Sequence, residues 1–205
     1  GELRWMGARR TENLLLYSST STGWTGVNTS TPPPVNAVNL DQDGNNLAWW
    51  FAAGSTGYLQ RNNYTLPADT STYLWSLWVK PLSSGAKIFP TLTGINGISA
   101  AGVPAEYDFD TDTFISMTSN ASSYIRADGW VRIQVRFTNN GSGTIFVNRM
   151  GTSADTNEKV LFGGVQLENV TNQSIQTAAD YVATTTTAVT KWFDTAQDGT
   201  PLRPI

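Results

Sequence analysis

Two stretches of the chain alternate strictly between side chains of two kinds, and this alternation limits the possible folds more than any other feature. They are TYLWSLWVKP, residues 72–81, and GWVRIQVRFT, residues 129–138. One set of alternate positions is wholly apolar: Tyr73, Trp75, Leu77 and Val79, and Val131, Ile133, Val135 and Phe137. A period of two places alternate side chains on opposite faces of a sheet. Each stretch is therefore predicted to be a strand with one face in the core and a more polar face, carrying a tryptophan, on the other side.

Dense turn signals separate further short strand-like runs. Gly- or Asn-rich breaks occur at residues 43–46, 54–57, 94–97, 128–129 and 139–141. Many short strands joined by turns are typical of a β-sandwich or a barrel. The sequence predicts one all-β domain over residues 12–190, with connecting segments at residues 1–11 and 191–205.

Composition excludes several kinds of function. The net charge is −3 and the chain has no Lys/Arg-rich run, which argues against nucleic acid or an anionic membrane surface as a partner. No apolar run approaches membrane-spanning length, so no membrane insertion is expected. Cysteine and histidine are both absent, which removes disulfides, a thiolate nucleophile, Ser-His-Asp chemistry and the usual zinc ligands.

The polar face of the predicted sheet has the chemistry of a sugar site. A third run, KVLFGGVQLEN at residues 159–169, is expected to pair nearby, with its double glycine marking a bulge or a close backbone approach. If Val165 and Leu167 point inward, Gln166 and Glu168 point outward. One of Trp49 and Trp50 is also expected outside. The predicted ligand-binding residues are Trp78, Arg132, Gln134, Arg136, Gln166, Glu168 and Trp50.

Sugars present apolar C–H faces and hydroxyl edges, so a sugar site needs an aromatic platform beside planar hydrogen-bonding groups. Arginine offers fixed bidentate geometry, and glutamine offers donor and acceptor together. The alternative is that this polar face packs on a loop, a neighbouring domain or a second subunit, with Arg–Glu pairs keeping it soluble.

Three aspartates at alternate positions in DFDTDT are candidate metal ligands. If Asp108, Asp110 and Asp112 share one strand face, their oxygens suit calcium in a structural role. The glycine and distal glutamate of an EF-hand loop are missing, and a polar edge strand near a turn is the alternative. No other cofactor is expected. Glu106 and Asp108 lie too close along one strand to flank a glycosidic bond, and no nucleophile motif appears, so the chain is not expected to be an enzyme.

A set of motifs follows in order along nearly the whole chain. They are GARRTENLLLYS, the Asp-Gly at 43–44, YLWSLWVK, YDFDTDT, DGWVRIQVRFT, FGGVQLEN and YVATTTTAVT. The ordered set resembles β-sandwich modules common in bacteriophage tail and virion proteins, which are similar to carbohydrate-binding modules of the galactose-binding-like type. The resemblance implies an antiparallel jelly-roll β-sandwich and a location on the virion or cell surface. It implies other virion proteins as partners and is compatible with a homo-oligomer.

Two functional hypotheses follow. The first is a non-catalytic carbohydrate-binding or adhesion module of a phage tail or fibre protein that recognises a bacterial surface glycan. The second is a structural module that decorates or bridges the virion and binds no small molecule. Eight tryptophans exceed what one core needs, so some are expected in a solvent-facing groove or in an interface.

Overall fold

The computed structural model describes residues 9–16, 25–29, 35–36, 49–93, 106–116, 121–139, 141, 144–152, 159–184 and 186–193. These residues form strands and connecting segments and include no helix. All strand pairs are antiparallel. The predicted all-β antiparallel sandwich is confirmed, and the arrangement is compatible with the jelly roll that the resemblance implies.

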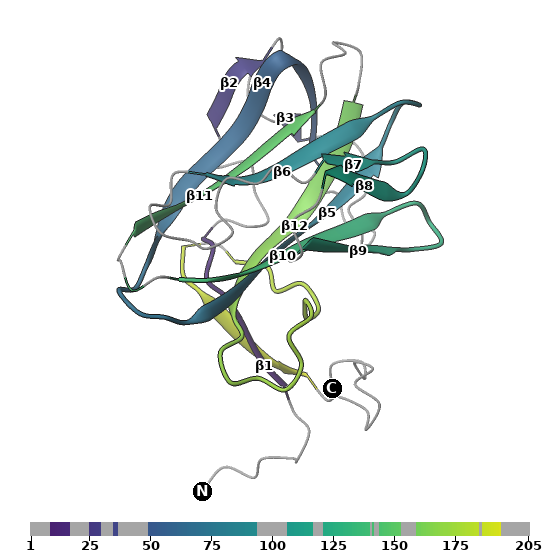
Figure 1. Cartoon of the computed structure of the whole chain (residues 1–205). Coiled ribbons are helices and arrows are strands. Elements are labelled where there is room, and N and C mark those ends of the chain that lie inside the picture. The colour runs from purple at the N-terminus through teal and green to yellow at the C-terminus, as the bar shows by residue number, and fades with distance from the viewer. Residues whose placement is uncertain are drawn as a thin grey trace, which may run out of the picture.

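Two sheets face one another and share one long strand (Figure 1). The first sheet contains, in spatial order, β3 (Val35–Asn36), the start of β4 (Trp49–Leu66), β12 (Lys159–Asn169), β5 (Thr72–Pro81), β10 (Val131–Thr138) and β9 (Ala121–Ile125). The second contains β2 (Thr25–Thr29), the rest of β4, β11 (Thr144–Thr152), β6 (Lys87–Thr93), β7 (Glu106–Asp108) and β8 (Thr113–Ser116).

Strand β4 joins the two sheets. Residues 49–52 pair with β12, and residues 58–66 pair with β11. In Figure 1 the strand arches over the top of the molecule between these two pairings. A strand that changes sheets makes a corner of a sandwich, so the sheets enclose a common core between them.

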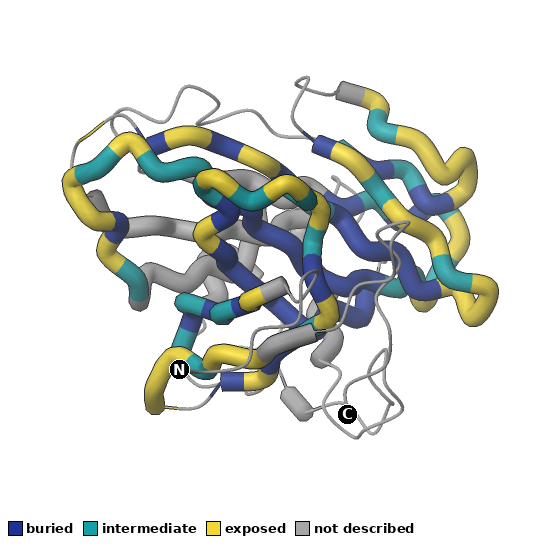
Figure 2. The backbone as a smooth tube through the Cα atoms, turned by 90° about the horizontal axis from the view of Figure 1, so that it is seen from below, coloured by how far each residue is buried: buried dark blue, intermediate teal, exposed yellow. Residues whose placement is uncertain are grey.

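The predicted core face is confirmed. The apolar set of β5 and β10 lies between the sheets in one cluster of buried residues: Tyr73, Trp75, Leu77, Val79, Val131, Ile133, Val135 and Phe137. Leu66, Ile88 and Tyr107 close the cluster from the second sheet. Figure 2 shows buried backbone concentrated in the middle of the strands, with exposed residues toward the hairpin ends.

The terminal parts of the described chain form a separate two-stranded ribbon. Strand β1 (Arg9–Asn13) pairs with β13 (Val189–Phe193), and Arg9 lies opposite Phe193. The predicted boundaries at residues 11/12 and 190/191 both fall inside this ribbon. Strand β12 next to it carries the predicted bulge, since its pairing register with β5 shifts between Gly163 and Gln166. Gly164 in this bulge has a φ of 55°, in the left-handed region that favours glycine.

Candidate functional site

Trp78 lies on the outer face of the first sheet, as the alternation predicts, but it is not open to solvent. Its exposed fraction is 7%, and it forms a small buried cluster with Trp130 and Leu161, apart from the main core. The outward position predicted for Trp78 is therefore correct, but the ring is covered by neighbouring side chains and is not an open platform for a sugar. Alternation determines the side of the sheet on which a side chain lies, but neighbouring side chains determine whether it is covered.

Those neighbours come from the β9–β10 hairpin. On the sheet, Arg132 lies opposite Trp78 of β5 on one side and opposite Tyr124 of β9 on the other. The guanidinium carbons of Arg126 and Arg132 each lie 5.5 Å from the centroid of the Trp78 ring. The Tyr124 ring meets it edge-on, with centroids 6.3 Å apart and an interplanar angle of 78°. We call Trp78, Tyr124, Arg126 and Arg132 the hairpin cluster.

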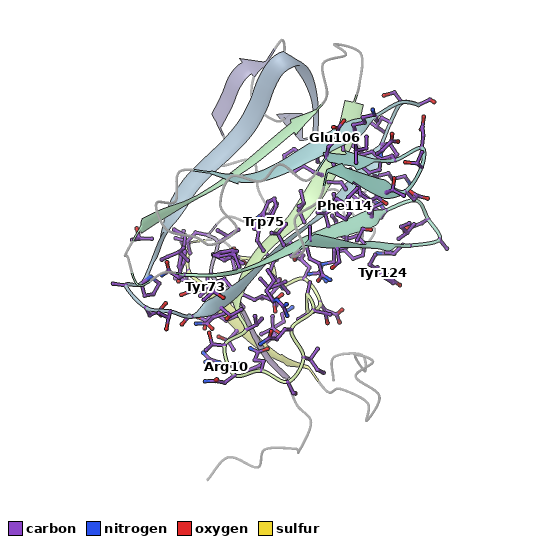
Figure 3. All side chains as sticks on the ribbon, viewed as in Figure 1. Arg10, Tyr73, Trp75, Glu106, Phe114 and Tyr124 are labelled. Atoms are coloured by element: carbon purple, nitrogen blue, oxygen red, sulfur yellow. The ribbon has the colours of Figure 1, made fainter. Side chains whose placement is uncertain are left out.

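Tyr124 is the most exposed member of the hairpin cluster. Its exposed fraction is 62%, and the adjacent Ile125 is 46% exposed. Figure 3 shows Tyr124 on the side of β9 that faces away from the sandwich, whereas Trp75 lies between the sheets. The Tyr124 ring is supported on one side because it packs in a T-shaped contact against buried Trp78. Such contact favours one orientation of an exposed aromatic side chain.

Tyr124 and Arg126 were missed by the sequence analysis, although a signal for them exists. The Asp128-Gly129 pair is a turn signal, and the turn is present: Gly129 has a φ of 82°, and its amide donates to Arg126 O at 3.0 Å. A hairpin folded at this turn places residues 121–125 beside β10 and therefore brings Tyr124 opposite Arg132. The stretch ASSYI is short and mixed in polarity, so its alternation alone did not identify a strand.

The other half of the predicted site is covered by the chain itself. Residues 171–184, which we call the C-terminal strap, lie against the outer face of β10 and β12. Gln134 Oε1 accepts from Ala178 N at 2.8 Å, and Gln166 Oε1 accepts from Val182 N at 2.7 Å. Glu168 Oε1 accepts from Ala179 N at 3.2 Å. The strap has no strand partner along this stretch, so these side chains satisfy backbone donors that a sheet ladder would otherwise satisfy.

Gln166 and Glu168 are consequently buried, with exposed fractions of 0% and 1%. Their predicted position on an open face is wrong; for them the alternative, packing on a loop, is what the structure shows. Arg136 is exposed and donates from a guanidinium nitrogen to Gln176 Oε1 of the strap at 3.1 Å. Gln134 is partly exposed and also donates to Ser122 Oγ at 2.7 Å. Trp50 pairs through its backbone with Leu161, but its side chain is outside the described residues.

The three aspartates do not share a strand face, so that premise of the calcium prediction is wrong. Asp108 ends β7, and Asp110 and Asp112 lie in the turn before β8. Asp108 Oδ1 accepts from Asp110 N at 2.9 Å, and Asp110 Oδ2 accepts from Gly85 N at 3.0 Å. The carboxylates of Asp108 and Asp110 therefore shape the turns at this end of the second sheet, while Asp112 Oδ1 accepts from the Tyr107 hydroxyl at 3.4 Å. Calcium binding by these residues stays a prediction.

Neither a group of metal ligands nor a membrane-spanning helix occurs among the described residues. No three His, Cys, Asp or Glu side chains there come together as a group able to hold a metal. The same part of the chain contains no helix with the length and apolar character needed to span a bilayer.

Comparisons with known proteins give distant structural likenesses. No protein-family model matches the chain, and no curated protein does. The structure is similar to the CBM22-1–GH10 modules of Clostridium thermocellum endo-1,4-β-D-xylanase 10B, solved with xylohexaose, at 12% identity and a TM-score of 0.48, over 78% of this chain and 28% of that one. It is similar to the enzymatically active domain of bacteriophage CBA120 tailspike protein 4, at 9% identity and a TM-score of 0.46, over 76% of this chain and 21% of that one. It is also similar to the N-terminal cellulose-binding domain of Cellulomonas fimi β-1,4-glucanase C, at 15% identity and a TM-score of 0.40, over 75% of this chain and 92% of that one.

Proposed function

We propose that this chain is a non-catalytic carbohydrate-binding module of a phage virion and that it holds a bacterial surface glycan on the outer face of the β9–β10 hairpin. The observation that carries the proposal is the exposed ring of Tyr124, fixed against Trp78 and flanked by Arg126. An aromatic ring in a fixed orientation suits the apolar C–H face of a sugar. The virion setting and the bacterial origin of the glycan rest on the motif resemblance.

Hydrogen-bonding groups surround this ring. Ser122 and Gln134 lie opposite one another on β9 and β10, and Ser122 is exposed. Arg126 retains 34% side-chain exposure at the turn. Each hydrogen bond to a sugar hydroxyl replaces one to water and contributes only about 0.5–1.5 kcal/mol. The affinity of one site is therefore expected to be weak, and many copies on one particle compensate because later contacts become intramolecular.

The carboxylates that most resemble a catalytic pair support a non-catalytic role. Glu106 and Asp108 both face the ammonium group of Lys87, with N–O distances of 3.7 and 3.8 Å. They belong to the second sheet, not to the hairpin cluster on the outer face of the first. In the described part of the chain, these two carboxylates are thus held by a shared cation on the sheet that does not carry Tyr124.

The test is a screen of immobilised bacterial glycans with the wild-type chain and two variants. Tyr124→Ala is expected to weaken binding about tenfold, since an aromatic contact of about 1.4 kcal/mol is lost. Ile115→Ala is the matched control, because Ile115 is similarly exposed, at 52%, but lies on β8 of the second sheet. Equal binding by wild type and Tyr124→Ala would contradict the proposed site. Binding to none of the glycans would contradict the proposed function.

One observation favours the structural alternative, a module that decorates or bridges the virion. Trp75, Trp78 and Trp130, the tryptophans with described side chains, are all buried, and the strap covers part of the polar face. Under this alternative, the exposed Tyr124 and Ile125 are contacts for another virion protein or a second copy. Sedimentation of the wild type and Tyr124→Ala tests this directly, because loss of an oligomer without any detectable glycan binding supports the structural role.

A further inference from the structure

Cationic side chains gather at the same end of the outer face as Tyr124. Arg126 and Arg132 both lie against the Trp78 ring. Lys80, two residues along β5 from Trp78, donates from Nζ to Asp128 O at 2.8 Å in the β9–β10 turn. The carboxylate of Asp128 meets Arg126 at 3.0 Å. Three cations, Lys80, Arg126 and Arg132, therefore lie in this patch together with the carboxylate of Asp128, although the whole chain carries a net charge of −3.

The acidic side chains of the neighbouring hairpins lie elsewhere. Glu106, Asp108, Asp110 and Asp112 belong to the β7–β8 hairpin of the second sheet. They contact Lys87, Ser84, Gly85, Tyr107 and backbone amides of the same hairpin. In the described hairpins, these four carboxylates therefore lie on the second sheet, whereas the three cations of the first sheet lie beside the exposed aromatic ring.

We infer that the glycan held at Tyr124 carries an anionic group, a carboxylate or a phosphate, which Arg126 receives; this rests on the proposed function. Arg126 follows Tyr124 by two residues, and its amide continues the ladder by donating to Trp130 O at 2.8 Å. Residues two apart along an extended chain point to the same side of the sheet. A sugar ring stacked on Tyr124 therefore has its substituents within reach of the Arg126 guanidinium.

The position of Arg126 suits this role better than that of Arg132. Arg132 is 7% exposed and donates to Ser76 Oγ at 3.1 Å within the sheet, so it supports the Trp78 ring. Arg126 is held over the same ring and by Asp128, yet a third of its side chain remains accessible. A guanidinium carries five N–H donors in a rigid fork, so a second oxyanion can share it with Asp128. The exposed Arg126–Asp128 pair itself contributes little stability, and its rearrangement costs little.

The experiment compares a carboxylated polymer with its neutral ester and with a phosphate polymer that has no sugar ring. Polygalacturonate carries one carboxylate per sugar, and its full methyl ester is neutral with the same backbone; poly(glycerol phosphate) supplies phosphate without a sugar ring. By calorimetry, we expect wild type to bind polygalacturonate about tenfold more tightly than the ester. Raising the salt concentration from about 0.05 to about 0.5 M should reduce this preference, because screening shortens the range of the attraction.

Variants of Arg126 test the recognition of an anionic group separately from glycan binding at Tyr124. Arg126→Gln is expected to bind the acid and the ester equally, while Arg126→Lys keeps a partial preference because it keeps the charge. Arg10→Gln is the control, since Arg10 is an exposed arginine, 57% accessible, on the distant ribbon. Circular dichroism confirms that each variant is folded.

The possible outcomes distinguish a carboxylated glycan, a phosphorylated glycan and a neutral glycan. Preference for polygalacturonate, lost in Arg126→Gln but kept in Arg10→Gln, supports a carboxylated glycan. Binding to poly(glycerol phosphate) that depends on Arg126 identifies phosphate as the recognised group. Equal binding of acid and ester by the wild type overturns the anionic inference and leaves glycan binding intact. Failure of Tyr124→Ala to weaken binding to any polymer overturns the proposed site itself.

Discussion

Asn13 bridges the bulge of β12 by donating from Nδ2 to the carbonyl oxygen of Val165 at 3.1 Å, 152 residues away in the chain. The same nitrogen donates to Val182 O in the strap at 2.8 Å. Asn13 Oδ1 accepts from Leu167 N at 3.2 Å, beyond the bulge. One buried amide therefore joins β1, β12 and the strap, where the bulge leaves backbone groups without ladder partners.

We predict that Asn13→Ala strongly destabilises the protein. The substitution leaves several buried backbone groups unpaired, and each costs about 1–3 kcal/mol, so a loss of about 3 kcal/mol or more in unfolding free energy is expected. Urea denaturation measures it. The control is Arg10→Ala on the same strand, whose exposed side chain predicts a change within about 0.5 kcal/mol. An Asn13→Ala variant as stable as the control would show that this bridge contributes nothing.

The core could be predicted from the sequence because apolar residues at every second position can be buried together only on one face of a strand. In β5 and β10 the apolar set that includes Leu77 and Ile133 occupies every second position over eight or more residues. A sheet buries such a set on one of its faces. The bulge could also be predicted, since a double glycine in a strand marks a backbone irregularity. These features are local, so they can be recognised in the sequence of one element.

The covering of the outer face could not be predicted in the same way. The strap has no hydrophobic period. It is placed by hydrogen bonds that its own backbone amides donate to Gln134, Gln166 and Glu168, side chains that suit a sugar equally well. The burial of Trp78 depends on Tyr124 and Arg126 from a neighbouring hairpin. Both are tertiary contacts between segments far apart in the sequence. Polar outward side chains therefore indicate a binding face without indicating whether its occupant is a ligand or the chain itself.

Ile133→Ala is expected to lower the unfolding free energy by about 2–5 kcal/mol, as for truncation of a large aliphatic side chain in a core. Ile133 is completely buried between the sheets, with Leu77 opposite it on β5. Thr138→Ala on the same strand, with an exposed side chain, is the control and should change stability by less than about 1 kcal/mol. Denaturant unfolding of both variants gives the comparison, and similar values would argue against the assigned inward face.

Trp78→Ala is expected to destabilise the protein by about 3–5 kcal/mol, although Trp78 lies outside the main core. The loss follows from its burial with Trp130 and Leu161 and from the two guanidinium groups that rest on its ring. Trp78→Phe keeps an aromatic ring and should cost less. Thermal and urea unfolding measure both. A Trp78→Ala variant as stable as the wild type would contradict this packing, and with it the support that the Trp78 ring gives to Tyr124.

Stability is expected to fall at alkaline pH through two buried tyrosines. Burial raises the pKa of Tyr73 from 10.0 to about 12, with a smaller contribution from the Asp69 carboxylate. Burial likewise raises the pKa of Tyr107 from 10.0 to about 12, followed by the charge of Asp112. The unfolded chain ionises first, so the stabilisation is fully present below pH 10 and is lost as the pH rises toward 12.

Urea unfolding at several pH values across this window checks the direction. Tyr107→Phe removes one of the two ionising groups, so its stability should fall less steeply with pH than that of the wild type. Ile115→Ala is the control for the substitution itself, since Ile115 is an exposed residue of β8 without an ionising group. Identical slopes for wild type and Tyr107→Phe would exclude Tyr107 as a source of the alkaline sensitivity.

The strap is expected to loosen when its acceptor on β12 is removed. Gln166 Oε1 accepts from Val182 N at 2.7 Å, while Gln166 Nε2 donates to Glu168 Oε1 at 2.8 Å. Gln166→Leu leaves the buried amide of Val182 without this partner, at a cost of about 1–3 kcal/mol, so local opening should accelerate its hydrogen exchange about tenfold or more. The amide of Ile133 in β10 should exchange as in the wild type if the opening is confined to the strap. Gln173→Leu is the matched control, because Gln173 lies in the strap and donates instead to Asn169 O at 3.0 Å. If Val182 exchanges at the wild-type rate in Gln166→Leu, the side chains of the outer face do not hold the strap in place, and the polar face is available to a ligand.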